Sequence, residues 1–190
     1  VSMGRRLVIV GGGAGGASTA AEAKRNDSSL DVTILQMGKF VSYASCPTPY
    51  YIGDLIRDEN KLIARTAEKF REGGIDVQLN AEVVNIDSGK TIVEVKGGQR
   101  FPYDILVMAT GTSAIMPEMP GLDLPGVFSL RNLEDAINIK RWLREKNAKR
   151  VVIIGGGFIG LEMSEALHAA AIATTIIHKD HLPANRWDAA

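Results

Sequence analysis

The chain has 190 residues, of which 45% are hydrophobic and 23% charged, so it can bury a core and still present a polar surface. Lys and Arg together number 22, as do Asp and Glu, which leaves no basic field to attract nucleic acid or an anionic membrane. No apolar run approaches the about 20 residues of a membrane span, and the single cysteine cannot form an internal disulfide. We therefore expect a cytoplasmic protein with no membrane or nucleic-acid partner.

The N-terminal part of the chain has the pattern of a βαβ unit. Leu7–Val10 is a continuous apolar run, as expected of a parallel strand that is buried on both faces. A glycine-rich turn follows, then the alanine-rich segment 17–25, which favours a helix, and a second apolar run at Asp31–Leu35. The fold class predicted from this order is α/β, with a Rossmann-like, doubly wound sheet.

The turn of this unit carries the spacing Gly-x-Gly-x-x-Gly at Gly11, Gly13 and Gly16. Such glycines allow a tight turn and let the backbone approach a pyrophosphate at the helix N-terminus, where free N–H groups favour anions. An acidic residue is expected about 20 positions later to accept from the ribose hydroxyls, but Gln36 stands there, and its carbonyl accepts without charge. We predict a dinucleotide site here.

The stretch Val41–Gly53 contains the only cysteine, Cys46. Pro47 suits a first helical turn, and a short irregular helix is predicted over Thr48–Ile52. A cysteine at the start of a helix is favoured as the reactive thiolate. The alternative is a buried structural cysteine. The polar neighbours, the proline-marked turn and the position after a nucleotide-binding strand favour the reactive thiol.

The middle of the chain is predicted to hold one helix over Asn60–Glu72 and a connector without regular structure at Met116–Pro125. A second helix is predicted over Asn132–Lys146. Strands are predicted over four further segments: Ile75–Leu79, Ala81–Asp87, Thr91–Lys96 and Tyr103–Ala109. The last of them is expected to be buried, and it ends in Thr110-Gly111, where small residues at the carboxyl end of a parallel strand can meet a ligand.

A second unit of the same kind begins at Val151–Ile154 and repeats the fingerprint at Gly155, Gly157 and Gly160. A helix is expected over Leu161–Ala171 and a strand over Thr174–Ile177. The acidic position is again absent, because His178-Lys179 stands there and Asp180 comes only afterwards. The basic pair favours NADPH over NADH through the 2′-phosphate, and a contact through Asp180 is the alternative.

In this order, the motifs resemble those of the flavin-dependent pyridine-nucleotide–disulfide oxidoreductases that use a single cysteine. This group includes coenzyme A-disulfide reductase, CoA-persulfide reductase and NADH oxidase. The resemblance covers essentially the whole chain and rests on five stretches: Gly11–Gly16, Ser42–Gly53, Ala109–Gly111, Ser129–Asn132 and Gly155–Gly160.

The resemblance implies cofactor and catalytic roles for particular residues. FAD is expected to contact Gly11, Gly13, Ala14, Gly16, Gln36, Ser42, Val83, Ala109, Thr110 and Gly111. NAD(P)H is expected to contact Gly155, Gly157, Gly160 and His178. Cys46 becomes the redox nucleophile that faces the flavin. The expected domains are an FAD-binding domain at 1–115, a connector and helix at 116–148, and the start of an NAD(P)H-binding domain at 149–190.

The implied activity passes electrons from NAD(P)H through FAD to Cys46, which reduces a low-molecular-weight disulfide or persulfide such as CoA-disulfide. In this family the basic contacts to coenzyme A come from the helix that here carries Glu22, Lys24 and Arg25. The alternatives are an NADH oxidase or peroxidase that uses a Cys46 sulfenic acid, and a non-catalytic nucleotide-binding fragment.

The family is more than twice as long as this chain, and its full-length members form homodimers. We therefore expect a fragment that by itself holds FAD poorly and turns over nothing. No metal site is predicted, because His168, His178 and His181 lack partner cysteines at ligand spacing.

Overall fold

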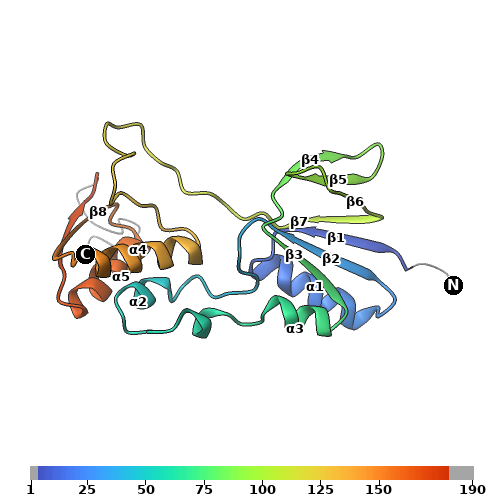
Figure 1. The fold of residues 1–190 in the computed structure, drawn as a ribbon, viewed down its shortest axis with the longest axis horizontal. Helices are drawn as coiled ribbons and strands as arrows, with labels where there is room; N and C mark the ends of the chain where they lie inside the picture. Colours follow the sequence, from blue (N-terminus) through green and yellow to red (C-terminus); the bar gives the residue numbers. More distant parts are fainter. Residues whose placement is uncertain (1–3, 180–190) are drawn as a thin grey trace, which may run out of the picture. The chain divides into compact units, whose positions relative to one another are not determined.

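A computed structural model describes residues 4–179. These residues divide into two compact units, one formed by residues 4–44 with 63–113 and the other by residues 45–62 with 114–179. The chain order of the elements is shown in Figure 1, and the α/β class predicted from the sequence is confirmed.

The first unit is built on a parallel sheet of four strands in the order β3-β2-β1-β7. Its strands are β1 (Arg6–Val10), β2 (Asp31–Gln36), β3 (Ile75–Leu79) and β7 (Ile105–Met108). In the register, Val10 lies opposite both Leu35 and Met108. The carboxyl ends of β1, β2 and β7 therefore meet at one edge of the sheet, where parallel α/β sheets bind ligands.

Two layers cover this sheet (Figure 1). On one face, helices α1 (Ala14–Asn26) and α3 (Ala67–Glu72) pack Ala20 and Phe70 against Ile9 and Ile34. On the other face lies an antiparallel sheet of β4 (Val83–Asp87), β5 (Ile92–Val95) and β6 (Arg100–Pro102). Its Val93 and Val95 share a core with Val8 and Val10. Because successive strand residues point to opposite faces, the apolar run of β1 supplies both cores.

The prediction of a single helix over Asn60–Glu72 is wrong. The structure has a short 3₁₀ helix, η1 (Glu59–Leu62), and then the separate helix α3. Between them Ile63 forms an isolated bridge with Tyr43, and Ala64 donates its backbone N–H to the carbonyl of Ser42. The side chain of Thr66 then caps α3 by accepting from the N–H of Lys69. These contacts with the segment before Cys46 break the helix, and sequence periodicity does not register them.

The second unit contains a parallel pair of strands, β8 (Arg150–Ile154) and β9 (Ala173–Ile177), joined by helix α5 (Phe158–Ala169). Helix α4 (Leu133–Glu145) precedes them, with Asn132 and Asp135 forming a reciprocal capping box at its start. The short helix α2 (Thr48–Ile52) packs against α4 and α5. The segment that contains Cys46 thus belongs to the unit that carries the second fingerprint.

Most of the other expected elements are present within one to three residues of their predicted ends. Residues 116–125 contain no helix or strand, as expected of the connector. Two details differ. Strand β6 lies where no strand was predicted, and β7 is half-exposed rather than buried, with Met108 54% exposed.

Candidate functional site

The first fingerprint forms a tight turn between β1 and α1. Gly11 has a φ of 103°, a conformation that side chains rarely allow, and a Cβ there would lie 2.1 Å from the carbonyl oxygen of Ala109. A Cβ on Gly16 would lie 1.8 Å from the carbonyl oxygen of Gly11. Both glycines are therefore required by backbone packing alone. Gly13 is the N-cap of α1, and Ala14 is its first residue.

Gln36 and Ser42 are tied to this turn by hydrogen bonds. The Oε1 atom of Gln36 accepts from the backbone N–H of Gly12 at 2.7 Å. The backbone N–H of Ser42 donates to the carbonyl of Gly12 at 2.8 Å. Ser42 has a φ of 51°, a left-handed conformation that costs a non-glycine residue roughly 1–3 kcal/mol and often marks a functional segment. The structure thus brings both predicted site residues to the fingerprint.

Of the other predicted residues of the first unit, Ala109 lies directly beside the turn and Val83 is connected to it only through a neighbouring residue. Ala109 donates its N–H to the carbonyl of Val10 at 2.8 Å, directly beside the turn, and Thr110 and Gly111 continue from it. Val83 is joined only indirectly, since Ala81, two residues earlier, donates to the carbonyl of Gln36 at 2.9 Å.

The turn leaves open space on its outer side. A Cβ added at Gly13 or Gly15 would meet no atom within 4 Å, in contrast to Gly11 and Gly16. The first N–H groups of a 13-residue helix are directed out of its N-terminus there, with no side-chain cap bonded to them. Open space, free donors and the positive end of a helix fit the pyrophosphate of a dinucleotide.

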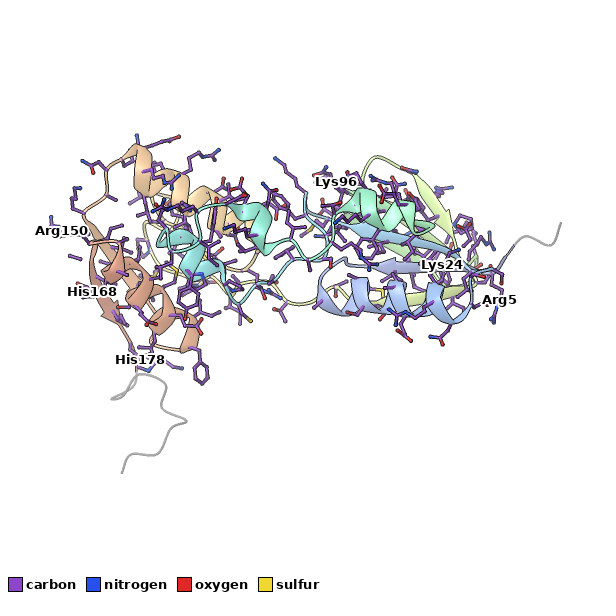
Figure 2. All side chains as sticks on the ribbon, turned by 90° about the horizontal axis from the view of Figure 1, so that it is seen from below. Arg5, Lys24, Lys96, Arg150, His168 and His178 are labelled. Atoms are coloured by element: carbon purple, nitrogen blue, oxygen red, sulfur yellow. The ribbon has the colours of Figure 1, made fainter. Side chains whose placement is uncertain are left out.

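The second fingerprint repeats this geometry. Gly155 has a φ of 112°, and a Cβ on Gly160 would lie 2.1 Å from the carbonyl oxygen of Gly155. Gly157, the N-cap of α5, has no atom within 4 Å of an added Cβ. His178, at the end of β9 (Figure 2), accepts from the N–H of Gly156 through Nδ1 at 3.1 Å. His178 thus occupies the place that Gln36 has in the first unit.

A cavity of about 820 Å³ lies within the second unit, next to this fingerprint. Its lining is mostly apolar and comes from the connector, α4, β8 and the start of α5. The three predicted nicotinamide-site glycines, Gly155, Gly157 and Gly160, belong to the lining. Its volume is within the range of small-molecule sites. Three of the four predicted NAD(P)H residues therefore line a space that can hold part of a dinucleotide, and His178 is not among the lining residues.

Cys46 is exposed and lies in a turn just before α2. The carbonyl of Ser45 accepts both the N–H of Thr48, at 3.2 Å, and its Oγ1 hydroxyl, at 2.7 Å. The short helix predicted over Thr48–Ile52 is confirmed as α2, and because Pro47 is its N-cap, Cys46 lies immediately before the helix. The alternative of a buried structural cysteine does not fit this exposed position.

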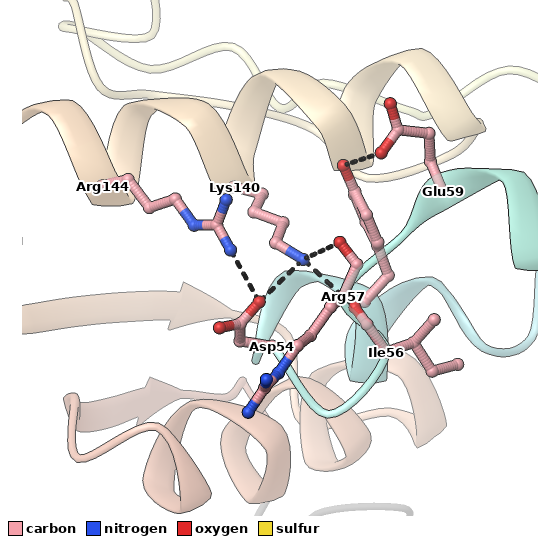
Figure 3. A network of polar contacts seen from close by, with 7 residues as sticks. Asp54, Ile56, Arg57, Glu59, Lys140 and Arg144 are labelled. Atoms are coloured by element: carbon pink, nitrogen blue, oxygen red, sulfur yellow. Dashed lines mark hydrogen bonds and ion pairs between the residues drawn. The ribbon is translucent and has the colours of Figure 1, made fainter.

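A polar network follows Cys46 in the chain, and the sequence reading missed it (Figure 3). Lys140 and Arg144 of α4 bind the carboxylate of Asp54 at 3.0 Å and 2.7 Å. The hydrogen bond from Lys140 is the main cause that lowers the pKa of Asp54. Burial raises the pKa of Tyr51 to about 12, helped by Glu59, which accepts from its hydroxyl at 3.2 Å. The available signal was that Lys140 falls at the buried position of α4, seven residues after Leu133.

The cations on α1 are engaged within the first unit. Lys24 (Figure 2) donates to the carbonyls of Ser28 and Leu30 at 2.9 Å and 2.7 Å, and so closes the end of the helix. Arg25 pairs with Glu22 on the same helix. The basic residues expected to contact coenzyme A are therefore already used in local contacts.

Residues 4–179 hold no group of three or more His, Cys, Asp or Glu side chains arranged to bind a metal ion. None of their helices is long and apolar enough to cross a membrane. Asp180 and His181, which the sequence reading also considered, lie outside the described residues.

Comparison with known proteins gives a consistent set of similarities. A Pyrococcus horikoshii protein described as "NAD(P)H coenzyme A polysulfide/persulfide reductase" is 39% identical over 178 residues, covering 93% of this chain and 40% of that protein. A Methanocaldococcus jannaschii "NADH oxidase" is 32% identical over 177 residues, covering 90% of this chain and 40% of that protein. The solved structure of an NAD-dependent persulfide reductase from A. fulgidus superimposes with a TM-score of 0.89 at 33% identity, covering 95% of this chain and 35% of that one.

The chain thus spans about 40% of the length of the curated relatives it matches. The model of one family, described as "Pyridine nucleotide-disulphide oxidoreductase", matches residues 5–189. This family implies FAD and NAD(P)H as cofactors, and the two fingerprint turns fit dinucleotides. With both turns and the family match in agreement, the chain belongs to the pyridine nucleotide-disulphide oxidoreductase family.

Proposed function

We propose that the protein of which this sequence forms all or part is a flavoprotein reductase of small disulfides or persulfides. The observation that carries the proposal is the exposed Cys46, the only cysteine in a chain that has two dinucleotide turns. No second cysteine of this chain is present to form an intramolecular redox disulfide. The oxidised partner of Cys46 must then come from outside the chain.

The first fingerprint would hold FAD, with Gly11, Gly13, Ala14 and Gly16 at the pyrophosphate. Gln36 would lie at the ribose, and the other FAD contacts would come from Ser42, Val83, Ala109, Thr110 and Gly111. Bound FAD supplies a two-electron relay between the nicotinamide and the sulfur. The second fingerprint would hold NAD(P)H through Gly155, Gly157, Gly160 and His178. The exposed Lys179 next to His178 supports NADPH, since a cation there favours the 2′-phosphate.

Cys46 would act as a thiolate nucleophile. It attacks one sulfur of a disulfide R–S–S–R, forms a mixed disulfide with that half, and releases the other half as a thiolate. Two electrons from NAD(P)H and a proton then return Cys46 to the reduced state and release the second thiol. With a persulfide R–S–SH, the Cys46 thiolate attacks the outer sulfur, which releases R–SH and leaves a persulfide on Cys46. Two electrons from NAD(P)H then reduce this persulfide, which releases sulfide and restores the Cys46 thiolate.

Two observations bear on the acceptor. The Pyrococcus horikoshii relative is described as acting on polysulfide or persulfide with coenzyme A. In this chain, however, Lys24 and Arg25 already bind groups of their own unit. This supports an acceptor whose binding does not depend on these two cations. The full-length protein is proposed to be a homodimer.

A second candidate is an NADH oxidase or peroxidase, which the similarity to the Methanocaldococcus jannaschii protein supports. In that reaction the Cys46 thiolate attacks peroxide and becomes a sulfenic acid, and the hydroxide that leaves takes up a proton to form water. Two electrons from NAD(P)H and a proton then restore the thiolate and release the sulfenic oxygen as a second water.

The test is a comparison of the full-length protein with its Cys46→Ser variant. We expect turnover of CoA-disulfide or persulfide to fall by at least about 100-fold, because a serine hydroxyl cannot form the mixed disulfide. NAD(P)H consumption should be measured with CoA-disulfide, persulfide and peroxide in parallel, which separates the two candidates. Unchanged turnover in Cys46→Ser would remove the thiol from the mechanism and favour a non-redox nucleotide-binding role.

A further inference from the structure

Helix α4 buries a lysine. Lys140 is 3% exposed and lies on the same helical stripe as the buried Leu133 and Ala136. A lysine is almost never buried unless its charge and its donors are matched, because an ammonium taken out of water loses its hydration. The contacts of this amine therefore show what the residue does.

All the donors of the ammonium group are used within the protein. Lys140 Nζ donates to the carbonyl of Ile56 at 3.1 Å and to that of Arg57 at 3.3 Å. It also contacts the Asp54 carboxylate at 3.0 Å and lies 3.9 Å from the centre of the Tyr51 ring. An ammonium has three N–H donors, so none remains for a ligand. Lys140 is thus a structural anchor rather than a binding group.

Every partner of Lys140 lies in one short segment, Tyr51–Arg57, which comprises the end of α2 and the turn after it (Figure 3). Asp54 in this turn has a φ of 67°. The N–H groups of Asp54 and Ile56 bond back to the carbonyls of Tyr51 and Tyr50, but the carbonyls of Ile56 and Arg57 need donors from outside the segment. Lys140, more than 80 residues away in sequence, supplies them.

The segment held by Lys140 is joined to Cys46 by continuous hydrogen bonding. Gly53 donates its N–H to the carbonyl of Pro49, and Tyr51 donates its N–H to the carbonyl of Pro47. Thr48 then binds the carbonyl of Ser45, the residue before Cys46. The far end of α2 is equally confined, since a Cβ on Gly53 would lie 2.4 Å from the carbonyl oxygen of Ala166 in α5. The turn that contains Cys46 therefore takes its position from the anchored helix.

We propose that Lys140 is a positioning residue for Cys46. By binding the turn after α2, it fixes that helix against α4 and α5 and so determines where the thiol is held. The proposal rests on the proposed function in one respect, which is that Cys46 is the reacting group.

The test uses the 190-residue chain, in which alkylation by iodoacetamide reports on a single thiol. Lys140→Met keeps an unbranched side chain, one heavy atom shorter, but removes the charge and its donors. We expect amide exchange in the peptides that cover residues 45–57 to accelerate about tenfold. We also expect Cys46 to be alkylated about threefold faster or more, as the loosened turn samples more accessible conformers. Exchange in β8 and in the fingerprint turn should stay within about twofold of the parent chain.

Two matched variants control for general destabilisation. Lys146→Met makes the same change at the C-cap of α4, where the amine lies 5.2 Å from the centre of the Trp142 ring and bonds no group of the turn. Arg144→Met removes the exposed partner of Asp54 and leaves both carbonyl contacts of Lys140 intact. Both should react at Cys46 as the parent chain does.

A folded Lys140→Met chain with parental alkylation and parental exchange over 45–57 would overturn the proposal. If Lys140→Met does not fold, Asp54→Asn replaces it, because asparagine tolerates the left-handed backbone and removes the charge that Lys140 and Arg144 bind. The Arg144→Met control shows how much of the effect comes from Arg144. The same two readouts then decide. Neither requires turnover, so this outcome is independent of the Cys46→Ser result on the full-length protein.

Discussion

At the scale of single residues, Gln36 and His178 have a role that the dinucleotide fingerprint does not predict. Each stands where an acidic residue is expected, and each accepts the N–H of the residue that follows the first glycine of its own fingerprint, Gly12 or Gly156. An imidazole accepts through Nδ1 only when that nitrogen carries no proton. These two side chains therefore hold the phosphate-binding turns in shape, in addition to any contact with a ribose.

Replacing Gln36 tests this role. Gln36→Leu leaves the N–H of Gly12 without its acceptor, and we expect the free energy of unfolding to fall by about 1 kcal/mol, with weaker FAD binding. Gln36→Glu keeps an acceptor and should bind FAD at least as tightly as the parent. Thermal unfolding and titration with FAD in the full-length protein measure both effects. FAD affinity equal to the parent in Gln36→Leu would contradict the role.

The Asp104 carboxylate gives a pH dependence with a definite sign. Arg6 donates to it through its side chain and its backbone N–H, at 2.7–3.1 Å, and these bonds lower the pKa of Asp104 to about 2. A carboxyl whose pKa is lower in the folded state stabilises that state above its ordinary pKa of 3.8, and this contribution is lost as the pH falls through about 2.

We therefore expect Asp104→Asn to have a lower melting temperature than the parent chain at pH 7. The difference should shrink steadily between pH 4 and pH 2, the interval set by the two pKa values. Melting curves of the two chains over this range provide the measurement. A difference that does not change with pH would mean that the Arg6 contact contributes through shape rather than charge.

At the scale of elements, the two strand–turn–helix units separate glycines required for folding from glycines that leave room for a ligand. Gly16 and Gly160 lie where any Cβ would collide with the carbonyl oxygen of the turn, at 1.8 Å and 2.1 Å. Gly13 and Gly157 face open space. The two kinds of position are three residues apart in each unit, and they give opposite expectations for the same substitution.

Gly16→Ala should destabilise the first unit by about 3 kcal/mol or more, because a backbone atom has to move to relieve the collision. Gly13→Ala should change stability by less than about 1 kcal/mol but weaken FAD binding, because its methyl group would occupy the space next to the pyrophosphate. Circular dichroism melts and FAD titration distinguish the two effects. Equal stabilities of the two variants would show that the turn can relax around a side chain.

The elements themselves were predicted well where the signal is local. The apolar run of β1, the glycine turn and the alanine-rich α1 follow from periodicity and composition, and so do their counterparts around β8 and α5. The helix predicted over Asn60–Glu72 failed because contacts with Ser42 and Tyr43, about 20 residues earlier, interrupt it. Such long-range contacts leave no periodic trace in the sequence.

At the scale of the whole chain, motifs that are neighbours in the sequence do not always pack in the same compact unit. The stretch with Cys46 comes directly after the first nucleotide-binding unit in sequence, yet it packs with α4 and α5 of the second. Residues 45–62 belong to the second unit, and the chain rejoins the first unit at Ile63, which forms an isolated β-bridge with Tyr43. The thiol thus shares a compact unit with the proposed nicotinamide turn.

The fold class, the two dinucleotide turns and the lone thiol can be read from the sequence alone. They depend on glycine spacing, on apolar runs and on the count of one residue type, all of which are visible without the fold. The folded chain is needed to see which glycines are sterically required, what Gln36 and His178 bind, and that a buried Lys140 binds the turn after α2. Each of these depends on groups that lie 5 to more than 80 residues apart and meet only when the chain is folded.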